Sequence, residues 1–149
     1  MAVATTAQWV FDKAMYLMDE ADQTSGQADH AETREYKNRT LPILNVLRVE
    51  CFPYSDTCQA HGPGRRPVCP EIPDLEAEIP LDDGICQGAL PYGLAAHLLL
   101  DENPPLASYF QQRYEELLNA LQRGIPAESE DIVDLYGGIE HGRFARWQG

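Results

Sequence analysis

Apolar residues recur at steps of three and four positions in four separate stretches of this chain, which is the spacing of one face of an α-helix. The first helix should begin near Thr5 or Thr6, whose side chains can cap the free N–H groups of a first turn. It should end near the polar stretch QTSGQAD, which contains a glycine. Its stripe consists of Val10, Ala14, Leu17 and Ala21.

The second predicted helix spans about residues 31–51. Its apolar face is formed by Tyr36, Thr40, Ile43, Leu47 and Cys51. Pro42 lies inside this stretch and has no N–H to donate to the preceding turn, so we expect it to kink or divide the helix. Pro53 should end it.

The third predicted helix begins around Leu81 and is apolar on nearly every side. Asp82 and Asp83 suit the positive end of its dipole. Several glycines and Pro91 lower its intrinsic helix propensity, so packing must hold it together. A helix with this pattern lies at the centre of a core or is covered by a neighbouring subunit.

The fourth predicted helix begins with Pro104 or Pro105 in its first turn and ends at Gly124 and Pro126. Together the four stretches predict a mainly α fold, in which about four helices pack as a small bundle. The helical domain should span residues 1–124, and residues 125–149 should form an extended C-terminal docking arm.

Residues 53–80 break the helical pattern, and six of the eleven prolines lie there. A stretch this long without a pattern is typically functional or mobile. We expect a protruding loop, or a β-hairpin that turns at Gly62–Gly64 and carries Arg65 and Arg66 near its tip. These arginines are candidates for contact with another subunit or a tail component, although simple solvation explains them about as well.

The net charge of -13 makes tight binding to a nucleic-acid backbone an unfavourable hypothesis. No apolar run approaches the ~20 residues of a membrane-spanning helix. The first residues show no basic leader followed by an apolar stretch, so we expect a chain made in the cytosol with reduced cysteines. A zinc site of Cys51, Cys58, His61 and Cys69 is only weakly indicated, because no pair has the close spacing of a metal-binding turn.

Searches for catalytic patterns yield no convergent site. The four histidines are scattered, His97 lies on an apolar helix, and adjacent acidic pairs splay around a helix instead of converging. The sequence therefore predicts a protein that is not an enzyme and requires no metal or cofactor.

The segment DLYGGIEHGRFARWQG combines helix-weakening glycines with residue types that dominate binding hot spots. It could fold back onto its own domain. We favour the alternative that its anchor residues insert into another protein. These residues are Tyr136, Ile139, Arg143, Phe144, Arg146 and Trp147.

Three segments carry a resemblance to a known family: TREYKNRTLPILNVLRVECFPYSD, LDDGICQGALPYGLAAHLLLDENPPLASYFQQRYEELL and YGGIEHGRFARW. From about Gln8 to Trp147 the chain resembles the head–tail connector (adaptor or head-completion) proteins in the neck of tailed phages and prophages of Gram-positive bacteria. The resemblance implies a mostly helical virion subunit, assembled in the host cytoplasm, that forms a ring beneath the portal, usually a dodecamer. It implies no catalytic residue.

In such adaptors the C-terminal arm fastens the ring to the portal protein, which here corresponds to about residues 130–149. The protruding loop faces neighbouring copies or the next component, a tail-side neck or tail-terminator protein. DNA would pass through an acidic ring without specific binding. Two alternatives remain open: a small cysteine-based metal protein, and a cytosolic regulatory or antitoxin-like module with a partner-binding tail.

Overall fold

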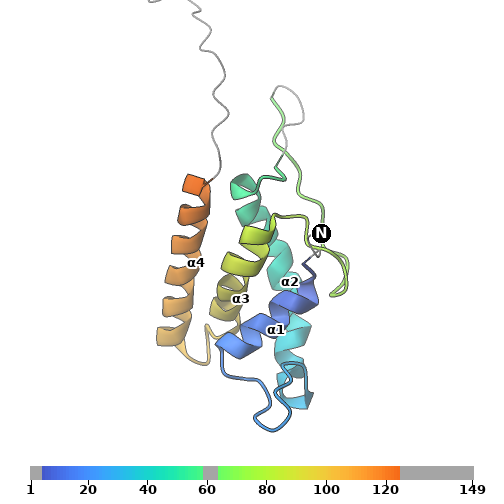
Figure 1. The fold of residues 1–149 in the computed structure, drawn as a ribbon, viewed down its shortest axis with the longest axis vertical. Helices are drawn as coiled ribbons and strands as arrows, with labels where there is room; N and C mark the ends of the chain where they lie inside the picture. The colour runs from blue at the N-terminus through green and yellow to red at the C-terminus, as the bar shows by residue number, and fades with distance from the viewer. Residues whose placement is uncertain (1–4, 59–63, 125–149) are drawn as a thin grey trace, which may run out of the picture.

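The computed structural model describes residues 5–58 and 64–124, and within them four α-helices form the fold (Figure 1). The predicted mainly helical class is confirmed. In the described residues the extended segments make one isolated bridge, between Thr6 and Glu78, and no strand. The helices are α1 (Ala7–Leu17), α2 (Arg34–Cys51), α3 (Leu90–Leu98) and α4 (Pro104–Gly124), with single turns η1 (Ala31–Thr33), η2 (Phe52–Tyr54) and η3 (Ile85–Ala89) beside them.

The start of α1 follows the predicted cap, because the Thr6 hydroxyl accepts a hydrogen bond of 3.2 Å from the Trp9 N–H. Its end comes earlier than predicted. Leu17 is the last helical residue, and Asp19 adopts a left-handed backbone conformation with φ of 60°. Ala21 therefore lies in the following loop and does not extend the apolar stripe.

The helix α2 continues through Pro42. Pro42 has no N–H to donate to the Asn38 carbonyl one turn earlier. The proline is tolerated because both residues are exposed, so water can reach this carbonyl. The predicted apolar face is confirmed except at Ile43, which is only partly buried, whereas Leu44 is fully buried. The buried residues of the helix are Tyr36, Thr40, Leu44, Leu47 and Cys51.

The region before α3 contains a π-helical turn, η3, which the sequence pattern did not predict. The Leu90 N–H donates to the Ile85 carbonyl five residues earlier. Pro91, the next residue, lacks an N–H, and its ring would crowd the carbonyl of Gln87 in a regular turn. The wider turn places the proline without that clash. Asp82 caps this segment, since its Oδ1 accepts from the Ile85 N–H at 3.0 Å.

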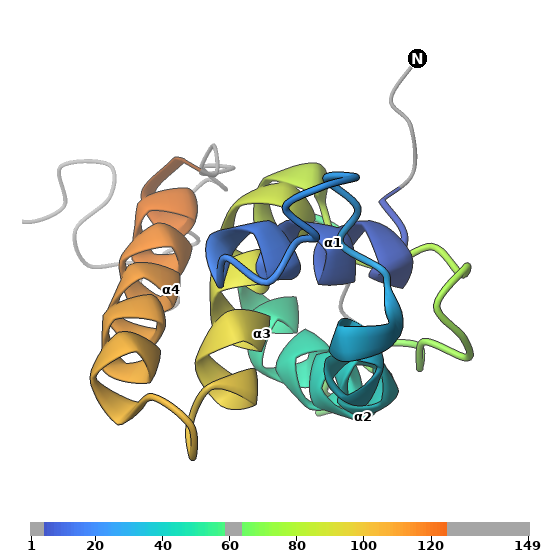
Figure 2. The same cartoon turned by 90° about the horizontal axis from the view of Figure 1, so that it is seen from below.

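The helix α3 lies at the centre of the described domain, with α1, α2 and α4 around it (Figure 2). Its apolar character on nearly every side is therefore explained by burial within its own chain. Gly93 lets the neighbours approach closely: a Cβ there would lie 2.8 Å from the Tyr114 ring and 3.2 Å from the Leu47 side chain. Its buried residues are Leu90, Pro91, Gly93, Leu94, Ala95, Ala96 and Leu98.

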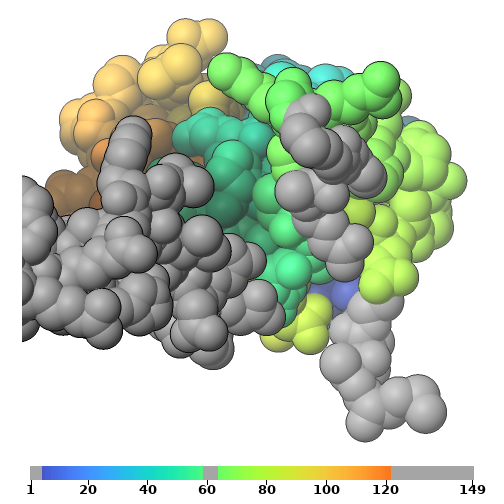
Figure 3. Space-filling view, turned by 90° about the horizontal axis from the view of Figure 1, so that it is seen from above, coloured from blue at the N-terminus to red at the C-terminus, as the bar shows by residue number. Residues whose placement is uncertain are grey.

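Much of the proline-rich segment packs against the helices. Ile72 and Ile79 are buried in the core. The Asn45 side chain makes two hydrogen bonds to the backbone of Ile72. Its amide N–H donates to the Ile72 carbonyl at 3.0 Å, and its amide oxygen accepts from the Ile72 N–H at 2.8 Å. Arg48 donates to the Cys69 carbonyl. The described residues of this segment form no hairpin; residues 64–80, green in Figure 3, cover the end of the molecule beside the end of α2.

We predict that Gly93→Ala destabilises the fold by about 1–3 kcal/mol, because Tyr114 is fully buried and cannot yield to a new methyl group. Gly88→Ala is the matched control, since no neighbouring group lies within 4 Å of the position that its Cβ would take. That variant should leave stability unchanged or raise it by up to about 1 kcal/mol, because alanine has the higher helix propensity. Urea unfolding measures both, and equal effects would show that the close approach at Gly93 is unimportant.

Candidate interaction surfaces

A groove runs between α2 and α4 over the end of α3. It encloses a volume of ≈ 500 Å³. Its apolar lining residues are Ala96, Ala107 and Leu100, of which Leu100 is 61% exposed. Its remaining lining residues are Glu50, His97, Ser108, Gln111, Gln112 and Glu115. A mixture of apolar and polar lining residues is common at protein-binding surfaces.

The rim of this groove is acidic. Glu50 lies on α2 and Glu115 on α4, so a carboxylate stands on each of the two walls. The Glu115 carboxylate accepts a hydrogen bond of 3.1 Å from the Gln111 amide, which leaves its charge uncompensated. The described lining residues include no lysine or arginine. The groove therefore favours a partner group that is apolar and cationic.

An exposed apolar stripe follows the outer face of α2. Pro42, Val46, Val49 and Pro53 recur at steps of four, three and four residues, and all are exposed. Val46 and Val49 keep 65% and 57% of their surface accessible. Val46 precedes Glu50 by one turn, so the stripe adjoins the groove. The spacing of these exposed residues is visible in the sequence. It was not predicted as a surface because the buried residues of the same helix follow a similar spacing.

On α1 three residues form a surface that we call the α1 ridge: Trp9, Lys13 and Tyr16. The Lys13 ammonium lies 5.2 Å from the centroid of the Trp9 ring and 5.6 Å from that of Tyr16. Such cation–π contacts at exposed sites contribute modestly, on the order of 0.5–1 kcal/mol. These three residues line a hollow of ≈ 330 Å³, together with the carboxylates Asp12 and Asp29. Tryptophan and tyrosine are residue types that are enriched in binding hot spots.

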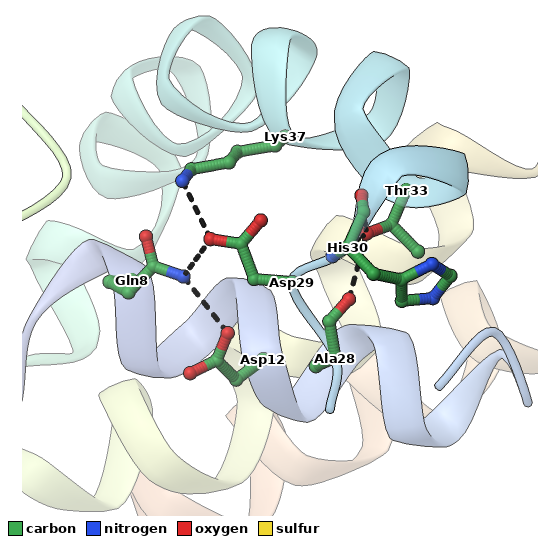
Figure 4. Close-up of polar contacts among 7 residues, drawn as sticks. All are labelled: Gln8, Asp12, Ala28, Asp29, His30, Thr33 and Lys37. Carbon is green, nitrogen blue, oxygen red and sulfur yellow. Dashed lines mark hydrogen bonds and ion pairs between the residues drawn. The ribbon is translucent and has the colours of Figure 1, made fainter. Parts of the chain in front are cut away.

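Two carboxylates lie near the α1 ridge, and among the described residues one of them, Asp29, has a cationic partner (Figure 4). The Gln8 amide donates to Asp12 at 2.9 Å and to Asp29 at 3.4 Å. Asp29 also pairs with the Lys37 ammonium at 2.6 Å. These contacts join α1, the following loop and α2. Since both ions of the pair are partly exposed, it adds little stability. Lys13, in contrast, makes no ion pair among the described residues.

The loop after α1 is fixed by a reciprocal cap at the start of η1. The His30 N–H donates to the Thr33 hydroxyl at 3.0 Å, and that hydroxyl donates to the Ala28 carbonyl at 2.8 Å (Figure 4). The buried Thr33 thereby fixes the residues that flank the hollow.

Another hollow, of ≈ 580 Å³, is lined by residues from both ends of this loop and includes Asp19, Glu20 and Glu32. Partial burial raises the pKa of Glu20, and the nearby charge of Glu102 raises it further. Glu102 accepts a hydrogen bond from the Tyr36 hydroxyl, which ties the loop before α4 to α2. Among the described residues no group of three or more acidic, histidine or cysteine side chains is arranged to hold a metal ion.

The four cysteines are free thiols in the structure. Cys51, Cys69 and Cys86 are buried, and Cys58 is partly exposed. Burial raises the pKa of both the Cys51 and the Cys86 thiol to about 12. Cys51 Sγ is also hydrogen-bonded to the Tyr114 hydroxyl, 3.0 Å away. The three buried thiols belong to the core. His61, the remaining member of the weakly indicated zinc set, lies outside the described residues.

The predicted contact residues fall in two places. Arg65 and Arg66 are exposed, and neither makes an ion pair among the described residues. The candidate portal contacts lie outside the described part of the chain, as does the whole predicted arm, residues 125–149; they are Tyr136, Ile139, Arg143, Phe144, Arg146 and Trp147. Sequence reasoning missed the groove and the α1 ridge.

No family model, curated protein or solved structure matches the chain. In the described part of the chain no helix combines the length and the apolar character needed to cross a membrane.

We predict that a thiol reagent at about pH 8 modifies Cys58 quickly, whereas Cys51 and Cys86 react only when the protein unfolds. Their burial blocks access, and their raised pKa values keep the thiolate fraction small. Mass-spectrometric mapping of the labelled cysteines with and without urea measures the difference. Fast labelling of Cys51 in the native protein would contradict its placement beside Tyr114.

Proposed function

We propose that this protein is a structural subunit of a phage neck, a head–tail connector that forms a ring beneath the portal and lines the path of the DNA. It would be held to the portal protein through residues 130–149 and reside in the virion. The class comes from the resemblance of the chain to connector proteins. The residues proposed to contact the portal are Tyr136, Ile139, Arg143, Phe144, Arg146 and Trp147.

The observation that carries the proposal is the exposed apolar stripe of α2. Val46 and Val49 lie on a helix whose opposite face already fills the core, so the fold of one chain leaves them uncovered. Contiguous exposed apolar residues beside an apolar groove are typical of a surface that another protein covers. Contact between neighbouring copies is the use that a ring-forming subunit would make of it.

The charge of the chain also supports this proposal. A net charge of -13 would repel the phosphates of passing DNA from a ring wall, so DNA could move without adhering. The exposed Arg65 and Arg66 are an exception to this acidity and are proposed to contact a neighbouring copy or a tail-side component.

We predict that the chain forms a large ring with its portal protein, and that truncation after Leu135 abolishes portal binding while the melting temperature stays nearly unchanged. The removed residues follow the end of α4 and are the proposed anchors. Trp147→Ala alone should weaken binding clearly, because aromatic anchors dominate hot spots. Native mass spectrometry and pull-down with the portal measure both effects.

Tyr109→Phe serves as the control, since it changes an exposed aromatic residue outside the arm, the groove and the α1 ridge and keeps the side chain aromatic. A sharp fall in melting temperature on truncation would show that the last residues belong to the domain core. A chain that stays monomeric or dimeric with every portal tested would instead favour the regulatory, antitoxin-like alternative.

A further inference from the structure

We propose that residues 66–74 are a preformed ligand in the polyproline II conformation, and that they dock in a groove lined by aromatic side chains on another protein. That this other protein is a component of the phage neck rests on the proposed function. The character of its groove follows from the spacing, burial and hydrogen bonds of the described residues.

The backbone of this segment is constrained by its prolines. They recur at every third position, as Pro67, Pro70 and Pro73. Each proline fixes its own φ near about −65° and restricts the residue before it to extended conformations. Residues 65–73 form no helix, turn or strand, and among the described residues no backbone–backbone hydrogen bond involves them. These are the features of a polyproline II helix, which has about three residues per turn.

Burial follows the same period of three residues. Cys69 and Ile72 are buried, and Leu75 packs against the core. The helix α2 holds this line in place: Arg48 donates to the Cys69 carbonyl at 2.6 Å. Asn45 makes its two hydrogen bonds to the Ile72 backbone. The segment is therefore fixed before a partner binds, which lowers the entropy cost of ordering it in a complex.

The other two lines of the segment face outward at the end of the molecule that residues 64–80 cover (Figure 3). The first, which we call the proline ridge, consists of Pro67, Pro70 and Pro73, and the last two of these are exposed. The second consists of Arg65, Val68, Glu71 and Asp74, all exposed. Val68 keeps 73% of its surface accessible. Proline-rich segments with this spacing dock in grooves lined by aromatic side chains.

The same prolines disfavour the other common way of binding an extended segment, which is its addition to the edge of a β-sheet. The three prolines have no N–H to contribute to a ladder of hydrogen bonds. The N–H of Ile72 already donates to Asn45. A partner must therefore recognise the rings and side chains of the ridge, since few backbone donors are free.

Charged residues at the two ends of the segment give it a direction. Arg65 and Arg66 precede the proline ridge, and neither makes an ion pair among the described residues. Glu71 and Asp74 lie at its other end. An aromatic groove with a carboxylate at one end and a cationic group at the other would complement this segment in one orientation only.

Site-specific photo-crosslinking of the full-length chain tests the proposal. Glu71, which is exposed beside Pro70, is replaced by p-benzoyl-phenylalanine, and the cells that naturally produce the chain are irradiated. Mass spectrometry then identifies the crosslinked protein and the position of the crosslink. We expect one partner protein, crosslinked at a site where tryptophan or tyrosine residues cluster.

Alanine variants show whether the crosslink depends on the proline ridge. Pro70→Ala/Pro73→Ala should lower the crosslinking yield by about tenfold, because it removes two rings and loosens the segment. Pro105→Ala is the matched control, since it removes an exposed proline from the first turn of α4, and it should change the yield by less than about twofold. If the double variant lowers the melting temperature, the single variants Pro70→Ala and Pro73→Ala replace it, each with a smaller loss expected.

The possible results separate this inference from the proposed function. A crosslink at an aromatic site that requires the proline ridge supports the inference, and capture of a protein without these two properties does not. No crosslink, a crosslink far from aromatic residues, or a yield that the double variant leaves unchanged overturns it.

The connector proposal is judged by the ring that the chain forms with the portal protein. If that ring forms and position 71 gives no crosslink, only this inference fails. If the ridge-dependent crosslink leads to a protein outside the virion and no ring forms with a portal, only the connector proposal fails. If neither the ring nor the crosslink is found, both fail.

Discussion

The close contact at Gly93 is the constraint on which the described fold depends. It lets the Tyr114 ring of α4 and the Leu47 side chain of α2 meet against the backbone of α3. Tyr114 in turn reaches Cys51 at the end of α2, so a single buried position joins three helices. Glycine and proline residues make α3 a weak helix in isolation, yet its small residues allow the neighbours to approach closely enough to bury it. Packing, and not intrinsic propensity, holds this helix in place.

Because α3 is covered within its own chain, the surfaces open to other proteins lie on the surrounding helices and loops. The outer face of α2 carries an apolar stripe, the groove beside it has acidic walls, and α1 presents aromatic rings with a lysine. The groove and the hollow beside the α1 ridge each combine apolar side chains with two carboxylates. Neither resembles a catalytic centre in the described residues, where the raised thiol pKa values arise from burial in the core.

The sequence predicted the helices well wherever a local rule was sufficient. The Thr6 cap and the prolines that open α4 depend only on neighbouring residues, and both are found where expected. Features that depend on distant residues were missed. The π-helical turn before Pro91, the Asn45 hydrogen bonds to Ile72 and the groove require knowing which segments meet in space. The predicted anchors of the C-terminal arm lie outside the described residues, so their role stays a prediction.

Amide hydrogen exchange in a dilute, monomeric sample tests most directly whether α3 is buried by its own chain. The amides of residues 92–98 should be among the slowest to exchange, and their rates should not change when the concentration is raised. The amides of exposed residues outside the helices, such as residues 64–66, provide the fast reference. Rapid exchange of α3 in the monomer, with protection gained only on association, would contradict the fold described here and would assign this helix to a contact between copies.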